Sequence, residues 1–564
     1  MSTKLTRREF IQSSIQLGLG VGVIGGLPFL NSGCAAHEFD FIIKNGTIID
    51  GSGKAAFKGD VGIIGQYIRA IGDLSDRTAT RTIDATNHIV CPGFIDVHSH
   101  SDICLLVNPN ADSKIRQGVT TEISGNCGYS PFPIAKENVA DYSADILEDY
   151  GVEVNWNDAG SFLKRLEEKG TALNYATFVG HSTIREVVMG MANKPATESD
   201  LKQMIYELEK GLDQGALGLS TGLEYTPGSF GSTEELIRLC QALPAYGGVY
   251  ATHMRNEDDR VMEAVAEAIE IGRKAGVSVQ LSHLKACQKK NWHFVDSFLA
   301  AIEAARAEDL NVHADRYPYI AYNTTLMLLF PLWFREGNTD EILARFKDEG
   351  LIAKVRPIVE QKISDIGSWD SILISSIASE ERRSCAGKTV LQNAQHENVE
   401  PFEWVRRTLI AEKGSVSMVV FAMDEETTIK VLQAPFTMIG SDGDSIATTG
   451  ILSKGNPHPR NFGTFPRVLG YYLRDRKITG LEEGIRKMTS LPAEKFGLKK
   501  RGAIQPGYFA DIVVFDLNAV ADCATFVQPK QYPKGITHVL VNGQWVINNE
   551  THTNNLPGMI LRRG

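Results

Sequence analysis

Residues 92–100 read PGFIDVHSH, an apolar strand-like run that ends in two histidines. His98 and His100 stand two positions apart, so in a β-strand both side chains lie on the same face. Two imidazoles on one face can reach a single metal ion. A His-x-His pair alone is a weak signal, because two surface histidines give the same pattern. The preceding Pro92-Gly93 and the nearby Asp102 strengthen it, and the rest of the chain has to supply further ligands.

Further along the chain, apolar strand-like runs alternate with amphipathic helical segments. The candidate strand ends are His98, Gly125, His181, Ser220, His253, His283, Asp315 and Asp442. Alternation of this kind indicates parallel strands joined by crossover helices. Eight such units close a barrel. The sequence therefore predicts an α/β fold whose main part, residues 93–497, is a (β/α)8 TIM barrel.

The spacing of the last two strands indicates an insertion. His253 and His283 end neighbouring strands and lie 30 residues apart (283 − 253), whereas Asp315 and Asp442 lie 127 apart (442 − 315). The excess predicts an additional subdomain at about residues 330–415. Because it follows the end of a barrel strand, it is expected at the carboxyl-terminal face, over the mouth of the barrel.

Both ends of the chain, after its first residues, read as short β-strands around turns. Asn45-Gly46 and Asn542-Gly543 lie between β-branched runs, a pattern typical of hairpins. Two β-rich ends around an α/β centre predict one small β-sandwich domain, built from residues 38–92 and 498–555.

Residues 1–33 resemble an export signal. Arg7-Arg8 precede Phe10 and an apolar, glycine-rich stretch, as in Tat-type signal peptides. Gly33-Cys34 resembles a lipobox, in which the cysteine is lipidated and becomes the new N-terminus, although Asn31 stands where an aliphatic residue is usual. These features predict an exported periplasmic or envelope lipoprotein that meets the membrane only through a lipid on Cys34. An uncleaved helical anchor is the alternative.

The composition excludes several classes of protein. Of 564 residues, 58 are Lys or Arg and 68 are Asp or Glu, so the net charge of −10 offers no basic surface for nucleic acid. Eight cysteines in a chain of this length do not make a disulfide scaffold. Apart from Cys34 their number is odd, so at least one thiol is free. In an exported protein a free thiol needs a reason, and metal binding is one.

Residues after other predicted strands complete a candidate metal site. Cys127 follows the second strand, and Asp442 follows the eighth. His253 and His283 end the fifth and sixth strands. Barrel active sites lie at the carboxyl ends of the strands, so these side chains are expected to converge there. Thiolate and imidazole are typical zinc ligands, which predicts a zinc site. A buried structural cysteine and a helix N-cap are the alternative roles of Cys127 and Asp442.

This set of residues resembles the amidohydrolase superfamily, and within it the D-aminoacylase (N-acyl-D-amino-acid deacylase) branch. The resemblance rests on PGFIDVHSH (92–100), SGNCG (124–128), STGLEYTP (220–227), YATHMR (250–255), GSDG (440–443) and HPR (458–460). These motifs lie in a region that extends from residue 38 to about residue 550. The cysteine at position 127 makes the resemblance specific, because many relatives use a carbamylated lysine in its place.

The resemblance implies roles for the metal ligands. The tighter zinc site would be formed by Cys127, His253 and His283. His98, His100 and Asp442 would flank it, and a second, weaker metal ion would bind there if two are held. As a catalytic residue, Asp442 would also take the proton of the attacking water and pass it to the leaving nitrogen.

The resemblance also implies substrate contacts. Tyr317 would donate a hydrogen bond to the developing oxyanion, and Arg460 would hold the substrate α-carboxylate. Tyr225 matches another position that contacts the substrate, and Asn323 stands where a small hydroxyl residue is expected. His181 also ends a strand, and both a substrate contact and a supporting role stay open for it.

The predicted function is zinc-dependent hydrolysis of N-acyl-D-amino acids, or of dipeptides with a C-terminal D-residue, to the free D-amino acid and a carboxylate. The expected partner is a small-molecule substrate. The stretch between Asp442 and Arg460 is longer than the family pattern leads us to expect, which leaves the acyl and side-chain specificity open. The number of metal ions and the oligomeric state also stay open.

Two alternative functions compete with this prediction. One is a cyclic-amide hydrolase of the hydantoinase or dihydropyrimidinase type. Those enzymes usually need a lysine carbamate, so Cys127 argues against it. The other is a non-catalytic envelope lipoprotein that binds D-amino acids. The complete set of candidate ligands, Asp442 among them, argues against that.

Overall fold

The computed structural model describes residues 37–135 and 139–563. The predicted signal peptide 1–33 and the lipidation site Cys34 lie outside the described residues, so both stay predictions. The chain divides into the units Met1–Glu38 and Phe39–Gly564, and the helices and strands named in this subsection all belong to the second unit. None of the helices in the described residues is long and apolar enough to cross a membrane.

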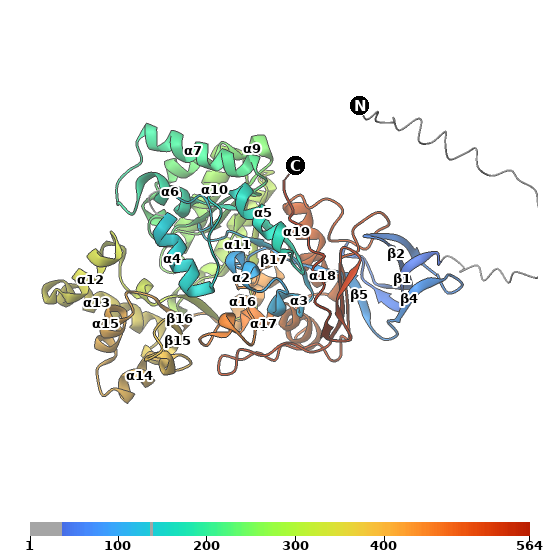
Figure 1. The fold of residues 1–564 in the computed structure, drawn as a ribbon. Helices are drawn as coiled ribbons and strands as arrows, with labels where there is room; N and C mark the ends of the chain where they lie inside the picture. The colour runs from blue at the N-terminus through green and yellow to red at the C-terminus, as the bar shows by residue number, and fades with distance from the viewer. Residues whose placement is uncertain (1–36, 136–138, 564) are drawn as a thin grey trace, which may run out of the picture. The chain divides into compact units, whose positions relative to one another are not determined.

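Parallel strands form the predicted barrel (Figure 1). In chain order they are β6 (Phe94–Asp96), β7 (Val119–Ser124), β8 (Asn174–Thr177) with β9 (Val179–Gly180), β10 (Gly218–Gly222), β11 (Val249–His253), β12 (Ser278–Leu281), β13 (Val312–Arg316) and β17 (Thr437–Ile439). β8 pairs with β7 and β9 pairs with β10, so these two short strands together fill one place in the ring. The ring closes where His100 N donates to Gly443 O at 3.1 Å. The predicted TIM barrel is therefore confirmed.

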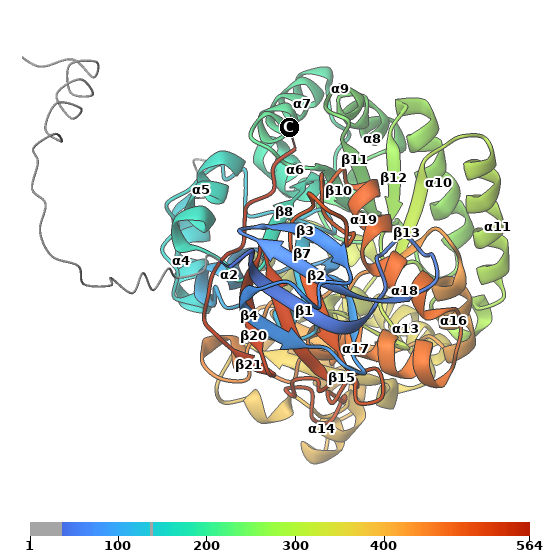
Figure 2. The ribbon, with the colours of Figure 1, turned by 90° about the vertical axis from the view of Figure 1, so that its right-hand side faces the viewer.

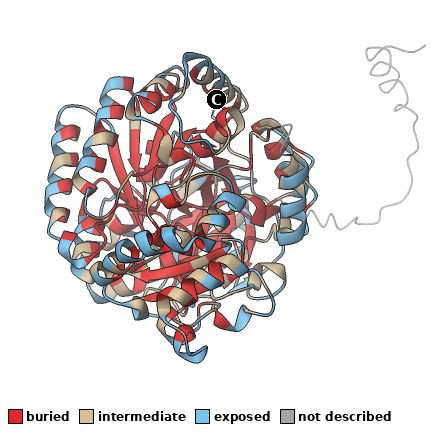
Figure 3. Ribbon diagram, turned by 90° about the vertical axis from the view of Figure 1, so that its left-hand side faces the viewer, coloured by how far each residue is buried: buried red, intermediate tan, exposed pale blue. Residues whose placement is uncertain are grey.

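Amphipathic helices cover the outer side of the barrel strands (Figure 2). They include α7 (Glu198–Asp213), α8 (Thr233–Cys240), α10 (Val261–Ala275) and α11 (Phe294–Ala307). In α10 the buried residues Val261, Val265, Ala268 and Gly272 recur at three- and four-residue intervals, which places them on one face. Figure 3 shows such buried faces turned toward the strands and exposed residues on the outer side.

The two chain ends meet in one β-domain beside the barrel. Its sheet has the order β21-β20-β19-β18-β5-β1-β2-β3, with β4 also paired to β1. The strands are β1 (Phe39–Ile48), β2 (Phe57–Ile64), β3 (Tyr67–Gly72), β4 (Ala79–Asp84), β5 (Ile89–Pro92), β18 (Ile512–Phe515), β19 (Ile536–Val541), β20 (Gln544–Asn548) and β21 (Thr551–His552). The N-terminal and C-terminal parts join where β5 runs antiparallel to β18, with Cys91 opposite Val513.

The β-domain is a single curved sheet, whereas the term sandwich implies two separate ones. The sheet curls so far that Ala510 N donates to Gln66 O at 2.8 Å, next to β3. Phe41 of β1 and Trp545 of β20 then meet edge to face, with ring centroids 5.5 Å apart. The two halves of one sheet therefore enclose the apolar core that a sandwich would have.

The last residues return to the barrel, which the sequence did not reveal. Leu561 N donates to Tyr175 O at 2.7 Å, and Tyr175 N donates to Met559 O at 2.9 Å. Ile560 thus lies beside β8 in a parallel bridge. The segment at residues 559–561 therefore pairs with β8 of the barrel.

An extra subdomain follows β13. It contains a sheet of order β14-β16-β15, formed by β14 (Ala321–Thr325), β15 (Ile372–Ile377) and β16 (Val416–Phe421). Its helices are α12 (Thr339–Lys347), α13 (Glu349–Ile366), α14 (Val390–His396) and α15 (Pro401–Ala411). Val355, Trp404 and Met418 belong to its own buried core.

The predicted bounds of this insertion, 330–415, are too narrow. The subdomain extends from residue 321 to residue 421, because its first and last strands, β14 and β16, pair with each other. The sequence of β14 is AYNTT, which is too polar to be recognised as a strand.

Candidate active site

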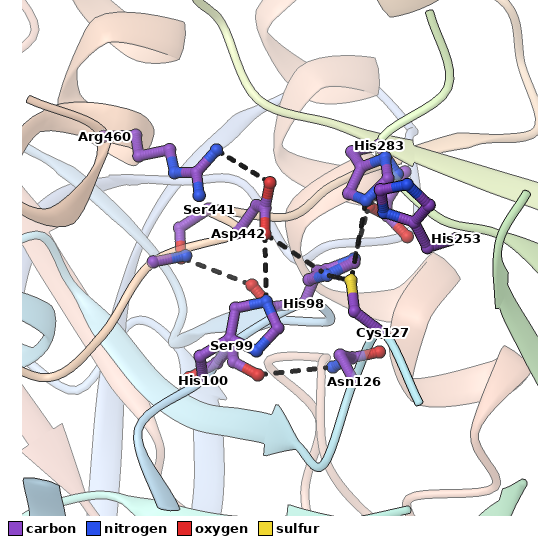
Figure 4. A network of polar contacts seen from close by, with 12 residues as sticks. His98, Ser99, His100, Asn126, Cys127, His253, His283, Ser441, Asp442 and Arg460 are labelled. Carbon is purple, nitrogen blue, oxygen red and sulfur yellow. Dashed lines mark hydrogen bonds and ion pairs between the residues drawn. The ribbon is translucent and has the colours of Figure 1, made fainter. Parts of the chain in front are cut away.

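Side chains from five different barrel strands converge at the carboxyl-terminal end of the barrel (Figure 4). Cys127 Sγ lies 3.3 Å from His98 Nε2 and 3.6 Å from His283 Nε2. Asp442 Oδ1 lies 3.5 Å from the same His98 nitrogen. His253 joins them from β11, with its ring centroid 4.6 Å from that of His283. All of these side chains are buried.

The backbone turns sharply where three of these side chains are attached. Cys127, His283 and Asp442 have φ angles of 53°, 38° and 52°, in the left-handed region that few non-glycine residues adopt. Such strain persists only where the surroundings enforce it, and it is common at functional sites. Next to Cys127, a Cβ on Gly128 would lie 2.6 Å from Gly222 N, so only glycine fits there.

The donor atoms fit a metal ion. Two groups of potential ligands lie within 4.8 Å: His98, Cys127, His283 and Asp442 form one, and His253, Glu257 and His283 form the other. Neither ring nitrogen of His253 has a hydrogen-bond partner among the described residues, although both are buried. Buried polar atoms are rarely left unsatisfied unless a ligand completes them. Sulfur and imidazole donors in such a group are typical of zinc.

The ligand grouping differs from the predicted trio of Cys127, His253 and His283. The structure brings His98 and Asp442 into the group of Cys127, and it pairs His253 with Glu257. Sequence reasoning did not identify Glu257, whose Oε1 lies 2.9 Å from His283 Nδ1. Only its position four residues after His253 could have pointed to it.

The electrostatics favour the charged forms of the thiol and the carboxyl. Burial raises the pKa of Cys127, but the surrounding imidazoles, His98 foremost, bring it well below its ordinary value. Burial also raises the pKa of Asp442, and the Arg460 guanidinium outweighs this and keeps it well below its ordinary range. A thiolate and a carboxylate are therefore available as ligands at neutral pH.

Asp442 is held between two cationic partners. Its Oδ1 lies 3.0 Å from His100 Nε2, and its Oδ2 lies 2.7 Å from Arg460 Nη1. His100 is the more accessible of the two motif histidines, with 30% of its side chain exposed. The carboxylate of Asp442 thus lies at the boundary between the metal-ligand cluster and the accessible cavity.

A second layer of buried residues orients the ligands. Asp315 accepts from His98 Nδ1 at 3.2 Å and from His283 N at 2.7 Å. The contact through Nδ1 leaves Nε2 of His98 for the metal. Deeper in the barrel, Lys114 Nζ lies 2.7 Å from both Asp96 Oδ2 and Ser441 Oγ. This network fixes the residue that precedes Asp442.

A cavity of about 350 Å³, called the catalytic chamber below, opens onto the cluster. Of the predicted residues, its lining includes His100, Cys127, Tyr225, His253, His283, Asn323, Asp442 and Arg460. Tyr225 Oη lies 3.2 Å from Thr324 Oγ1, so a barrel loop meets the inserted subdomain here. Asn323 Oδ1 accepts from Ser375 Oγ at 2.9 Å.

Lys285 also lines the chamber and was missed by sequence reasoning. Its Nζ lies 2.5 Å from Glu257 Oε2 and 2.9 Å from His283 Nδ1, and the side chain is buried. Lys285 follows His283 by two residues, the same spacing as in the His98–His100 pair. That spacing was the available signal for it.

Two of the residues predicted to lie near the substrate, Tyr317 and His181, do not line the chamber. Tyr317 is not among the described residues that line the chamber; its ring is buried, with the Arg460 guanidinium 5.0 Å from its centroid. His181 is also absent from that lining, and its Nε2 lies 2.8 Å from Glu235 Oε1. Both follow the last residue of a strand. The Tyr317 hydroxyl has no hydrogen-bond partner among the described residues, so its role as a donor to the oxyanion stays a prediction. The contact with Glu235 favours the supporting role of His181.

Comparison with known proteins gives a consistent result. The family Amidohydro_3, an amidohydrolase family, matches residues 81–315 and 431–547 and leaves out the inserted subdomain. D-aminoacylase of Alcaligenes xylosoxydans xylosoxydans is 37% identical over 528 residues, which cover 94% of this chain and 98% of the relative. N-acyl-D-glutamate deacylase of the same organism is 34% identical, with 93% and 97% covered.

Solved structures agree with these relatives. N-acyl-D-glutamate deacylase from Bordetella bronchiseptica, complexed with zinc and a phosphonate inhibitor, has a TM-score of 0.79 at 33% identity, and the match covers 93% of this chain and 99% of that one. A D-aminoacylase with a binuclear metal centre has a TM-score of 0.78 at 37% identity, with 93% and 100% covered. L-hydantoinase from Arthrobacter aurescens, at 17% identity and a TM-score of 0.54, shares only the fold. The chain belongs to the amidohydrolase family, in its D-aminoacylase branch.

Proposed function

We propose that the protein is a zinc-dependent hydrolase that cleaves N-acyl-D-amino acids into the free D-amino acid and a carboxylate. One observation carries the proposal: a buried cluster of Cys127, His98 and His283 adjoins Asp442, whose carboxylate faces an accessible chamber. The D-aminoacylase and the N-acyl-D-glutamate deacylase described above support this substrate class.

Different residues of the site have different roles in amide hydrolysis. Bound in this cluster, zinc would acidify a water molecule and polarise the substrate carbonyl. Asp442 accepts the proton of the attacking water and delivers it to the leaving nitrogen. His100 and Arg460 hold the two oxygens of Asp442, so its carboxylate keeps one orientation during the transfer.

Arg460 is suited to a second task, the recognition of the substrate carboxylate. Its Nε has no hydrogen-bond partner among the described residues, and the side chain lines the chamber. A guanidinium can bind Asp442 through one edge and a carboxylate through another. Lys285 brings a further positive charge to the same chamber. Tyr225 and Asn323, which line the chamber, are the proposed neutral contacts.

A substrate panel tests the proposal. N-acetyl-D-amino acids, their L-enantiomers, L-Xaa-D-Xaa dipeptides and hydantoins are incubated with the protein before and after treatment with a chelator. We expect hydrolysis of D-compounds only, its loss with the chelator and its recovery with added zinc. Turnover of hydantoins instead would favour a cyclic-amide hydrolase. A protein without metal and without any turnover would favour a binding lipoprotein.

We also propose that the protein is exported by a Tat-type signal and anchored through a lipid on Cys34. Arg7-Arg8, the apolar stretch after them and Gly33-Cys34 support this. Fractionation of expressing cells tests it: the parent protein is expected with the membrane, and Cys34→Ala is expected in the soluble exported fraction. Recovery of the parent protein in the cytoplasm would contradict the proposal.

A further inference from the structure

A second cavity adjoins the catalytic chamber. It measures about 750 Å³ and is called the second chamber here. The two cavities share the lining residues Asn323, Thr325, Ser417 and Asp444. Asp444 lies two residues after Asp442, so the boundary between the chambers is next to the reacting centre. A substrate bound at the metal cluster can therefore extend into the second chamber.

The lining of the second chamber is mostly polar, although it also includes apolar residues such as Ile377, Ile446 and Leu452. One side is the sheet of the inserted subdomain, which contributes the hydroxyl residues Thr325, Ser375, Ser376, Ser415 and Ser417. Another part of the lining is the end of α4 (Val139–Tyr150), with Glu148 and Asp149. The long segment between Asp442 and Arg460 completes it and contributes Lys454.

Strand β14, which contributes Asn323 and Thr325 to the lining of both chambers, has no neighbouring strand on one of its two edges. β14 pairs with β16 on one side, where Ile320 O accepts from Met423 N at 3.2 Å. Ala321 O points the other way and accepts from His458 Nε2 at 3.0 Å. Because alternate residues of a strand address the same edge, Asn323 and Thr325 present their N–H and C=O groups there too. No backbone hydrogen bond outside the sheet involves these two residues within the part of the chain that the structure describes.

We propose that the second chamber binds a peptidyl acyl group, so that the natural substrate is a peptide with a C-terminal D-residue. An extended peptide would add to the edge of β14 from the catalytic chamber outward, as peptides add to exposed sheet edges. This inference rests on the proposed function. In the reaction, water adds to the last peptide carbonyl, the C–N bond breaks, the shortened peptide keeps the new carboxylate, and the D-amino acid leaves with the proton on its nitrogen.

The size and polarity of the second chamber favour a peptidyl acyl group. The second chamber has about twice the volume of the catalytic chamber, more than the side chain of one D-residue would need. A fatty acyl chain would bury the hydroxyl and charged groups of the wall without hydrogen bonds, which is unfavourable. Peptide groups offer both donors and acceptors to such a wall.

The test compares substrates of different length with one C-terminal residue. The N-acetyl panel identifies a hydrolysed D-residue, and kcat/KM is then measured for N-acetyl-D-Xaa and for N-acetyl-Ala-Ala-D-Xaa. We expect the longer substrate to have a kcat/KM about ten-fold higher or more, because remote binding contributes to the transition state. Hydrolysis of the acetyl compound with no gain on lengthening would overturn this inference and leave the proposed function intact. Failure of both substrates would remove the proposed function as well.

The variant Ser376→Tyr tests whether the second chamber causes the higher kcat/KM of the longer substrate. Ser376 lines that chamber and not the catalytic one among the described residues, so the tyrosine should remove the gain and leave hydrolysis of N-acetyl-D-Xaa unchanged. Thr339→Tyr, on an exposed position at the start of α12, is the matched control. Should Ser376→Tyr misfold, Lys454→Tyr at an exposed position of the same chamber replaces it. A gain that survives the folded variant would contradict the assignment.

Discussion

The sulfur of Cys127 lies 3.3 Å from Nε2 of His98, inside the barrel and shielded from solvent. The two residues come from adjacent strands, β6 and β7. A thiolate and an imidazole at this distance would supply two of the four ligands that zinc usually takes. Tight zinc binding is therefore expected to depend on Cys127.

Cys127→Ser is expected to weaken zinc binding more than the roughly 10- to 100-fold that loss of a supporting hydrogen bond costs. A serine hydroxyl does not ionise at neutral pH and is a poorer ligand than a thiolate. The measurement is zinc per chain by elemental analysis after dialysis against graded chelator. Cys240→Ser, a buried cysteine away from the cluster, is the control and should keep its zinc. Equal zinc retention in both variants would show that the thiolate is not a ligand.

Lys114→Met is expected to destabilise the fold. The Lys114 ammonium lies 2.7 Å from Asp96 Oδ2 and 3.6 Å from Glu122 Oε2, and all three side chains are fully buried. Without it, two buried carboxyls lose their positive partner, which costs about 3–5 kcal/mol. Thermal unfolding should show a Tm several degrees lower. Lys164→Met breaks only an exposed pair with Glu168, so its Tm should stay close to that of the parent.

His313 makes the protein less stable in acid. Burial, together with Lys495, Arg306 and Arg486, lowers the pKa of His313 to about 2. The unfolded chain binds a proton at this histidine near pH 6.5 and the folded chain does not, so stability is full above pH 6.5 and falls below it. Between pH 6.5 and 5 the loss is about 2 kcal/mol.

His313→Gln is therefore expected to flatten the pH dependence of Tm between pH 7 and 5. The neutral glutamine removes the protonation that favours the unfolded chain. His396→Gln, at an exposed histidine, is the control and should follow the parent curve. A variant curve as steep as that of the parent would mean that His313 is not the source of the acid sensitivity.

The barrel and the positions of its ligands could be predicted from the sequence because strands and helices alternate regularly along the chain and the ligands recur at the ends of strands. His253 ends β11, and His98 and His283 each stand two residues after the end of an apolar strand. The carboxyl ends of parallel strands meet at one face. The sequence could not show which other residues would lie beside these ligands. Glu257 and Lys285 look like ordinary surface residues until the fold buries them beside His283.

The prediction was least exact where the chain leaves regular structure. Tyr317 directly follows β13, and His181 begins helix α6 (His181–Met189), so the alternation of a strand does not fix the direction of either side chain. The bounds of the insertion failed for a different reason: β14 is a short polar strand that is stable only because β16 pairs with it. Its partner lies about a hundred residues away, beyond the reach of any local pattern.

The most direct test of the account is one measurement on Asp442→Asn: zinc content and the rate of N-acetyl-D-amino-acid hydrolysis, determined on the same sample. Asparagine keeps the shape of Asp442 but cannot carry the proton, so the variant should retain zinc on Cys127, His98 and His283. Its kcat should fall by about 10²- to 10⁴-fold. Zinc retained with an undiminished rate would contradict the assignment of Asp442 as the group that moves the proton.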